Sequence, residues 1–446
     1  MADLLSKAYW NAFTLWHARD EGQLPYRPLD EILALQNRRV RAIVAHAYET
    51  VPYYREVISQ AGLSPSDFRT ADDLAKLPIL TPNQLAREPE RFLSRRYTNG
   101  RSLQLHSSGT SGRLRKIHYD AAALFMALAH GHRQRLVLAQ FVGRTFSYRE
   151  MVSNRPGSIA FRIRDFYDSH SWVPRNINLE RSFLSPGDAF EDNVEKINAF
   201  QPDVLRGYGS YIGALFRRAK EQGLPIFRPK ALVYGGDRMA DADRSLVEAE
   251  FGVPVLSTYQ AAEALRIAFQ CERREGFHIS LDHTAVRVIG AAGNPVSPGS
   301  SGDIVISNLT NRATVLLNYK LDDVVTLGRA PCPCGRTLPT IEWIDGRADD
   351  LIALPDGRLI HSLVVLAPLH RVPGVIQVQL IQEDLQHFLL RAVGVGEIDR
   401  EQACRGLEAA LGARLGIDIS VAIEWMDVIP SEPGGKIRAV ISRCRK

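Results

Sequence analysis

The chain has 446 residues, of which 45% are hydrophobic and 24% charged, so it lies in the globular range and is long enough for about two to four domains. Its 55 basic and 50 acidic residues form no dense Lys or Arg run, so we do not expect nucleic-acid binding. The N-terminal stretch lacks the layout of a signal peptide, no apolar run could span a membrane, and five scattered cysteines do not suit a disulfide framework. We therefore expect a cytoplasmic protein without a membrane span.

A helix is predicted first, from Leu33 to Ala47, where apolar residues fall at helical spacing. Short β-rich runs then alternate with helical runs. The expected strands are 103–106, 116–119, 231–234 and 253–258, and the expected helices are 210–222 and 241–250. This alternation predicts a layered α/β domain with parallel-rich sheets.

From residue 278 to 327 the pattern changes to strands separated by turns rich in Gly, Pro and Asn, at 285–289, 303–307 and 315–319. These strands predict a small antiparallel sheet or barrel. Beyond residue 346, we expect strands at 375–382, 388–393 and 420–425 and a helix at 400–415, which together make a small α+β domain. The expected division is thus residues 1–346 and 347–446.

A polar, glycine-containing loop lies between the first two expected strands. It consists of Ser107, Ser108, Gly109, Thr110, Ser111 and Gly112. Glycines permit a tight turn, and hydroxyl and backbone N–H groups can surround a polyphosphate. No Lys follows the second glycine and no helix is evident, so this is not the loop of the P-loop NTPases. Taken alone, the hexapeptide fits an ordinary polar turn equally well.

Together with five later stretches, this loop resembles the adenylate-forming superfamily, which includes acyl-CoA synthetases. The stretches occur in the order found in that superfamily: YGGD at 234–237, TYQAAE at 258–263, YKLDD at 319–323, GRADD at 346–350 and GGK at 434–436. The segments RRVRAIVAHAYETVPYYRE and DLAKLPILT are similar to the branch of phenylacetate-CoA ligases and CapK-like proteins. Ordered matches of this kind are much more specific than any single motif.

The resemblance implies an AMP-forming ligase that uses ATP and Mg²⁺ to activate a carboxylic acid. It implies a large N-terminal domain that binds ATP and the acid, and a mobile C-terminal domain. The serine- and glycine-rich loop would hold phosphates, with Arg115 and Lys116 either adding charge or lying at a solvated strand end. Further nucleotide contacts are implied for Gly235, Gly236, Asp237, Tyr259, Asp323 and Arg347, with Asp322 as the neighbouring alternative to Asp323.

Catalytic roles are implied for Glu263, as a ligand of Mg²⁺, and for Lys436, as a cation beside the α-phosphate. Asp349 would be the hinge between the domains. The acid is expected to be aromatic or otherwise apolar, and Tyr208, Tyr211 and Ala261 are candidates to line its pocket. The acyl group would pass to CoA; alternatives are an acyl carrier protein, an amine, or an inactive nucleotide-binding relative. A homodimer is also common in this branch.

Two departures from the family pattern occur. The motif usually written YGxTE is YQAAE in residues 259–263, without the hydroxyl that normally precedes the glutamate. The Lys/Arg-Gly loop that often follows the hinge is replaced by LIALPDG in residues 351–357. The second half-reaction is therefore less firmly predicted than the first.

Cys271, His278, Cys332 and Cys334 form a separate pattern of metal-ligand residues. Three thiolates and one imidazole suffice for a closed tetrahedral Zn²⁺ site, although a C-x-C spacing is tighter than the usual C-x₂-C. His283 is an alternative to His278. The competing interpretation, buried cysteines that act as small apolar residues, is equally compatible with the sequence.

Overall fold

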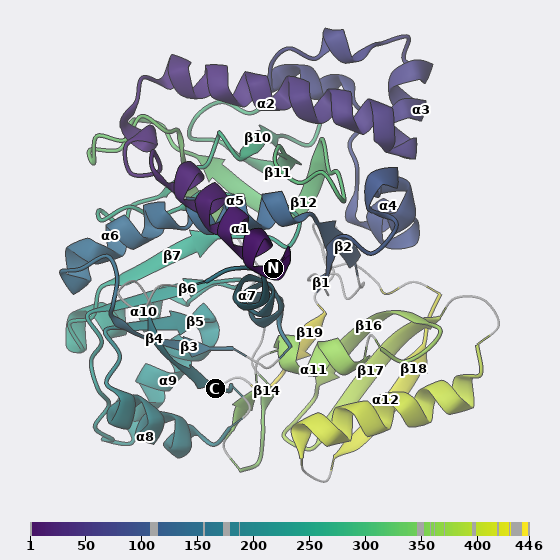
Figure 1. The fold of residues 1–446 in the computed structure, drawn as a ribbon. Coiled ribbons are helices and arrows are strands. Elements are labelled where there is room, and N and C mark those ends of the chain that lie inside the picture. The colour runs from purple at the N-terminus through teal and green to yellow at the C-terminus, as the bar shows by residue number, and fades with distance from the viewer. Residues whose placement is uncertain are drawn as a thin grey trace.

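The computed structural model describes most of the chain as two parts, a large one and a smaller C-terminal one (Figure 1). The described residues are 2–107, 115–154, 157–172, 179–186, 188–345, 352–356, 358–360, 362–369, 371–394, 398–416, 419–427, 429 and 439–444. No helix in these ranges is long and apolar enough to cross a bilayer.

Twelve α-helices lie within the described ranges. They are α1 (Ala2–Ala18), α2 (Leu29–Thr50), α3 (Pro52–Gln60), α4 (Pro82–Arg87), α5 (Ala121–His130), α6 (His132–Val142), α7 (Ile159–His170), α8 (Phe190–Phe200), α9 (Gly209–Glu221), α10 (Asp241–Glu250), α11 (Ser362–Leu369) and α12 (Arg400–Leu415). In Figure 1, α2 runs across the strands β10 and β11. Its buried side chains, which include Ile32, Val40, Ile43 and Val44, lie on one face and belong to the main core.

The large part is built on one mixed sheet. Its strands, in spatial order, are β10 (Thr284–Ile289), β11 (Ser301–Asn308), β12 (Tyr319–Leu327), β13 (Thr340–Asp345), β9 (Phe277–Ile279), β8 (Ala268–Phe269), β7 (Val255–Tyr259), β6 (Ala231–Gly235), β5 (Val204–Gly207), β3 (Arg149–Ser153) and β4 (Glu180–Leu184). Neighbours from β4 to β7 are parallel, whereas all pairs from β7 to β10 are antiparallel. The predicted α/β class is therefore confirmed, but the antiparallel strands extend the parallel sheet instead of forming a separate barrel.

The parallel strands β6 and β7 lie where the sequence predicts strands. All five residues of β7 are buried, as expected for a strand covered on both faces. A separate hairpin is formed by β1 (Leu103–Ser107) and β2 (Arg115–Tyr119), which pair antiparallel.

One predicted strand is partly wrong. Residues 315–318 do not join the ladder, and β12 begins only at Tyr319. The hydroxyl of Tyr54 accepts a hydrogen bond from Leu317 N at 2.8 Å and donates one to Val315 O at 3.1 Å. A side chain from α3 thus satisfies backbone groups that a strand would have paired with another strand.

The smaller part has its own core. Its strands are β14 (Ile352–Ala353), β15 (Leu359–Ile360), β16 (Val375–Gln382), β17 (His387–Gly394), β18 (Ser420–Trp425) and β19 (Val440–Ser442). A mixed sheet in the order β18-β17-β16-β19 packs with α11 and α12 around a cluster that contains Leu380, Leu390 and Leu407. The predicted helix 400–415 and strands 375–382 and 420–425 are confirmed. The domain boundary at residue 346 stays a prediction, because residues 346–351 lie outside the described ranges.

A buried ion-pair network fastens the N-terminal segment to the sheet. Arg133 donates from Nη1 and Nη2 to the two carboxylate oxygens of Asp282, each at 2.9 Å, and its Nε lies 2.6 Å from Glu21. Arg39 of α2 donates to the Asp282 carbonyl. Burial opposes ionisation of Asp282, but Arg133 and the neighbouring cations outweigh it and hold its pKa well below the usual range.

Asp282→Asn is expected to lower the free energy of unfolding by about 3–5 kcal/mol, since it leaves Arg133 buried with only Glu21. Chemical denaturation at pH 7 measures this. The loss should persist over pH 5–8 and shrink only below about pH 4. A carboxyl group whose pKa is lowered by folding stabilises the fold at pH values above its pKa in the unfolded chain.

The matched control is Asp168→Asn, which breaks the exposed pair of Asp168 with Arg164 in α7. It should change stability by less than about 1 kcal/mol. Equal losses from the two variants would show that the buried network has no special role.

Candidate active site

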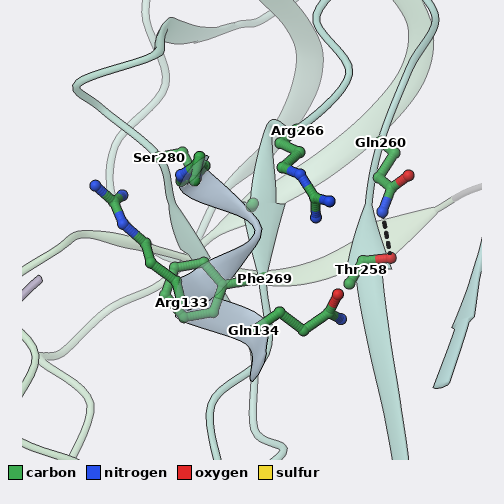
Figure 2. A pocket seen from close by; sticks show the side chains of 9 residues that line it. Arg133, Gln134, Thr258, Gln260, Arg266, Phe269 and Ser280 are labelled. Carbon is green, nitrogen blue, oxygen red and sulfur yellow. Dashed lines mark hydrogen bonds between the residues drawn. The ribbon is translucent and has the colours of Figure 1, made fainter. Parts of the chain in front are cut away.

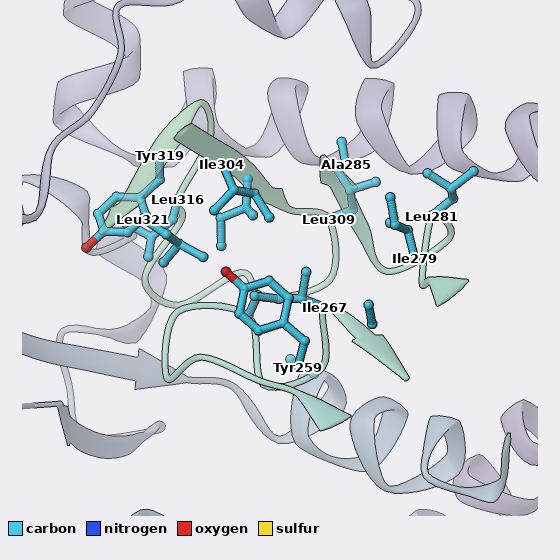
Figure 3. Packing of buried hydrophobic residues seen from close by; sticks show 14 of the residues in the cluster. Tyr259, Ile267, Ile279, Leu281, Ala285, Ile304, Leu309, Leu316, Tyr319 and Leu321 are labelled. Atoms are coloured by element: carbon cyan, nitrogen blue, oxygen red, sulfur yellow. The ribbon is translucent and has the colours of Figure 1, made fainter. Parts of the chain in front are cut away.

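Two strands far apart in sequence meet at Tyr259. This residue ends β7, and its hydroxyl donates to Asp323 Oδ2 of β12 at 2.8 Å. Figure 3 shows the rings of Tyr259 and Tyr319 among buried aliphatic side chains such as Leu316 and Leu321. Burial, and then the Asp323 carboxylate, raise the pKa of Tyr259 well above its usual value, so the phenol stays protonated as a donor.

A buried cation and carboxylate lie close to this bond. Arg115 Nε lies 3.4 Å from Glu263 Oε1, and the two side chains are only 6% and 3% exposed. Arg115 Nη1 donates to Tyr319 Oη at 3.2 Å, and that hydroxyl donates to Glu263 Oε1 at 3.4 Å. Glu263, Arg115 and Tyr319 therefore form one network, and Arg115 is not a solvated strand end. Lys116, by contrast, is exposed.

Backbone contacts fix the segment that carries the glutamate. Asn308 Nδ2 donates to Glu263 O at 3.0 Å, and Tyr119 Oη donates to Ala262 O at 2.8 Å. These bonds tie the turn after β7 to β11 and β2. The position of Glu263 is thus set by three different elements.

The serine- and glycine-rich loop closes the hairpin of β1 and β2, because Ser107 pairs with Arg115. This pairing brings the base of the loop next to Glu263. The rest of the loop, Ser108 to Gly112, lies outside the described residues, as do Arg347, Asp349 and Lys436. Their assigned roles stay predictions.

The YGGD motif lies at the carboxyl end of β6, beside β7. Gly236 has φ +88°, a conformation that favours glycine, and a Cβ on Gly235 would lie 2.7 Å from Thr258 Oγ1. Asp237 accepts from Gly209 N at 2.5 Å and from Ser210 N at 3.2 Å, at the start of α9. In this structure, Asp237 therefore holds a helix N-terminus.

The cysteine and histidine pattern forms a compact cluster. The ligand atoms of Cys271, His278, Cys332 and Cys334 all lie within 4.8 Å of one another. Cys271 Sγ is 3.8 Å from Cys332 Sγ, and Cys334 Sγ is 3.4 Å from His278 Nε2. Burial, aided by Arg336, lowers the pKa of His278 to about 4, so its imidazole is neutral at pH 7. The cluster is therefore a candidate metal site.

The alternative ligand named from the sequence lies elsewhere. The ring of His283 stacks on His130 at 4.2 Å, and its Nε2 lies 3.4 Å from Asp282 Oδ2. His283 belongs to the buried network that fastens the N-terminal segment. Of the two histidines, His278 is the one beside the thiols.

A narrow cavity opens beside Gln260, the residue after Tyr259 (Figure 2). It is lined by His130, Arg133, Gln134, Thr258, Gln260, Arg266, Ala268, Phe269 and Ser280. The sequence did not single out Gln134 or Arg266, since neither belongs to a motif. The only sequence signal for Arg266 was its position shortly after the YQAAE motif. The suggested Tyr208, Tyr211 and Ala261 are not among its lining residues.

Known proteins of similar sequence cover nearly the whole chain. The family profile of the CapK C-terminal domain matches residues 352–443. A phenylacetate-coenzyme A ligase of Thermus thermophilus is 27% identical, over 94% of this chain and 98% of its own length. Protein CapK of Staphylococcus aureus is 22% identical, over 94% and 91% of the two chains.

Solved structures agree with the fold. A 2-hydroxyisobutyryl-CoA ligase, determined with 2-HIB-AMP and CoA in the thioesterification state, superimposes with a TM-score of 0.62 and 19% identity, over 94% of this chain and 91% of that one. The same ligase in its postadenylation state gives a TM-score of 0.61. This chain is therefore similar, over more than 90% of its length, to proteins of the branch of the adenylate-forming superfamily that contains the phenylacetate-CoA ligases and CapK.

Proposed function

We propose that this protein is an AMP-forming acid:CoA ligase that resembles the phenylacetate-CoA ligases. The observation that supports this most directly is the convergence of Tyr259, Glu263 and Asp323 beside the base of the serine- and glycine-rich loop. These residues come from separate motifs, and they meet at the carboxyl end of β7, where ligands of parallel sheets bind.

In the first half-reaction, the acid carboxylate attacks the α-phosphorus of ATP, and pyrophosphate leaves. The loop from Ser107 to Gly112 would bind the leaving phosphates through N–H and hydroxyl donors. Asp323 would accept hydrogen bonds from the ribose hydroxyls, and Tyr259, which holds this carboxylate in place, would flank the adenine. Asp323 thus already accepts a hydrogen bond from Tyr259 and is oriented before nucleotide binds.

Glu263 suits a magnesium ligand by its chemistry, because Mg²⁺ is bound by one or two carboxylates together with substrate phosphates. When bound, Mg²⁺ supplies positive charge at the phosphate oxygens. Arg115 compensates the buried Glu263 carboxylate and orients it. The missing hydroxyl before Glu263, where Ala262 stands, removes one donor that the family often has there.

Lys436 would place its ammonium beside the α-phosphate while negative charge builds, and Arg347 would contact the nucleotide near the hinge at Asp349.

In the second half-reaction, the CoA thiol attacks the acyl carbonyl and AMP leaves. CoA is favoured over a carrier protein or an amine because two of the relatives that match more than 90% of this chain, from Thermus thermophilus and Escherichia coli, are coenzyme A ligases. Their substrate, phenylacetate, supports an aromatic or otherwise apolar body for the acid.

We also infer that the Cys271 cluster binds Zn²⁺ as a structural ion. In a tetrahedral site with Zn–S bonds of about 2.3 Å and Zn–N bonds of about 2.0 Å, ligand atoms lie about 3.5–3.8 Å apart. The observed 3.8 Å between Cys271 and Cys332 and 3.4 Å between Cys334 and His278 are close to those edges. Four protein ligands leave no open position, so the ion would join the loop after β8 to the loop before β13.

The ligase activity is tested by pyrophosphate release from ATP and Mg²⁺ with aryl, arylacetic and aliphatic acids, each with and without CoA. Acid-dependent release and CoA-dependent formation of AMP are the expected results. Release that CoA does not accelerate would favour a carrier protein or an amine as acceptor.

Lys436→Ala is the negative control for this assay. It should lower acid-dependent release by on the order of 10²-fold or more while ATP binding is kept, because a positioned charge acts on the transition state. Arg405→Ala, at an exposed site of α12, should leave the rate unchanged. Undiminished release by Lys436→Ala would exclude its assigned role.

The metal site is tested by elemental analysis of the purified protein. About one zinc per chain is expected, and Cys332→Ser should lose the metal and lower the melting temperature. Cys444→Ser changes a cysteine outside the cluster and should retain both. A wild-type protein free of zinc, with all thiols reduced, would contradict the assignment.

A further inference from the structure

The cavity of Figure 2 borders the end of β7, the strand that carries Tyr259. Thr258 and Gln260, on either side of Tyr259, form one wall, so the cavity lies at the carboxyl end of β7. A molecule that reacts with the nucleotide there could extend into this space. The cavity is thus placed to bind part of the acid, and its lining bears on which acid is used.

Arg266 gives the cavity an uncompensated positive charge. Its Nε donates to Ala127 O at 3.1 Å, and no carboxylate of the described residues forms an ion pair with it. Burial lowers its pKa to about 10, which still leaves it charged at neutral pH. Arg133, on the other side of the cavity, is by contrast neutralised by Glu21 and Asp282. Arg266 is partly buried and has no carboxylate partner among the described residues, so an anionic ligand in the cavity would supply the missing counter-charge.

Further donors surround the same space. Gln134 is buried, and its Oε1 accepts from Arg206 Nη1 at 3.2 Å, which leaves its amide nitrogen as a donor. Gln260 Nε2 donates to Thr258 Oγ1 at 2.9 Å. Figure 2 shows Arg266, Gln134 and Gln260 converging near Thr258.

The cavity is also small. The volume that the centre of a water molecule can occupy in it is about 10 Å³, which corresponds to room for about one water. A compact group fits such a space better than a second ring.

We propose that the acid carries, besides the carboxylate that is activated, a second compact anionic group at its far end, and that Arg266 and Gln134 bind this group. The chemical class is a dicarboxylic acid, in which an aryl or alkyl body joins the two carboxylates. This inference rests on the proposed function and adds a specificity role for two residues outside the family motifs.

The test compares kcat/KM for acid-dependent pyrophosphate release within matched sets of acids: 4-carboxyphenylacetate, 4-methylphenylacetate and phenylacetate, and succinate against butyrate. The wild type should prefer the dicarboxylic member by on the order of 10²-fold or more, because an unpaired buried donor disfavours the analogue that lacks the acceptor. Arg266→Gln should abolish this preference, and Arg266→Lys should restore part of it. The KM for ATP should stay unchanged in both.

Arg164→Gln, at an exposed site of α7, is the matched control and should keep the wild-type preference. Thermal unfolding shows whether each variant is folded, and Gln134→Met provides a second variant, which should also weaken the preference. Equal losses for all acids in Arg266→Gln would mean that Arg266 binds the reacting carboxylate, and this would overturn the inference. A wild type that prefers the monocarboxylic members would overturn it while leaving the proposed function intact, whereas release with none of the acids would contradict both.

Discussion

The hydrogen bond between Tyr259 and Asp323 joins the two halves of the large sheet at the proposed site. Tyr259 ends the last parallel strand, β7, and Asp323 lies in β12 of the antiparallel region. The parallel strands bring their carboxyl ends to one edge, as in other open α/β sheets. The antiparallel strands then supply the carboxylate that faces this edge. Glu263, Arg115 and the narrow cavity all lie close to this junction, so their positions depend on how the two regions of the sheet meet.

The charged side chains around this junction differ in how completely they are paired. Arg133 and Asp282 are fully paired and make an N-terminal connection that needs no ligand. Glu263 is paired with Arg115 at a longer distance of 3.4 Å, and Arg266 has only a backbone acceptor among the described residues. Because desolvation of a charge is costly, less complete pairing is tolerated best where a ligand completes it. The difference separates the structural network from the groups that we assign to nucleotide, metal and acid.

The sequence predicted most of what depends on local pattern. Helix 400–415 and strands 375–382 and 420–425 were predicted within their observed bounds, because capping residues and alternation define them. The prediction of a strand at residues 315–318 was wrong because the hydroxyl of Tyr54, far away in sequence, forms hydrogen bonds with backbone groups of this segment. The same reason explains why Arg115 could be named near the loop but not as the partner of Glu263, and why Arg266 and Gln134 were missed. Pairings of this kind are set by tertiary contacts, which periodicity and motif spacing do not contain.

Calorimetric titration of Mg²⁺ and ATP would show whether Asp323, oriented by Tyr259, binds the ribose of ATP as we propose. We expect the wild-type protein to bind ATP and Asp323→Asn, which keeps the size of the side chain, to bind it about 10-fold or more weakly, as for the loss of a hydrogen bond to a charged group. Glu401→Gln, at an exposed site in α12, should bind like the wild type. Unchanged affinity in Asp323→Asn, or no binding by the wild type, would show that Asp323 does not bind the ribose.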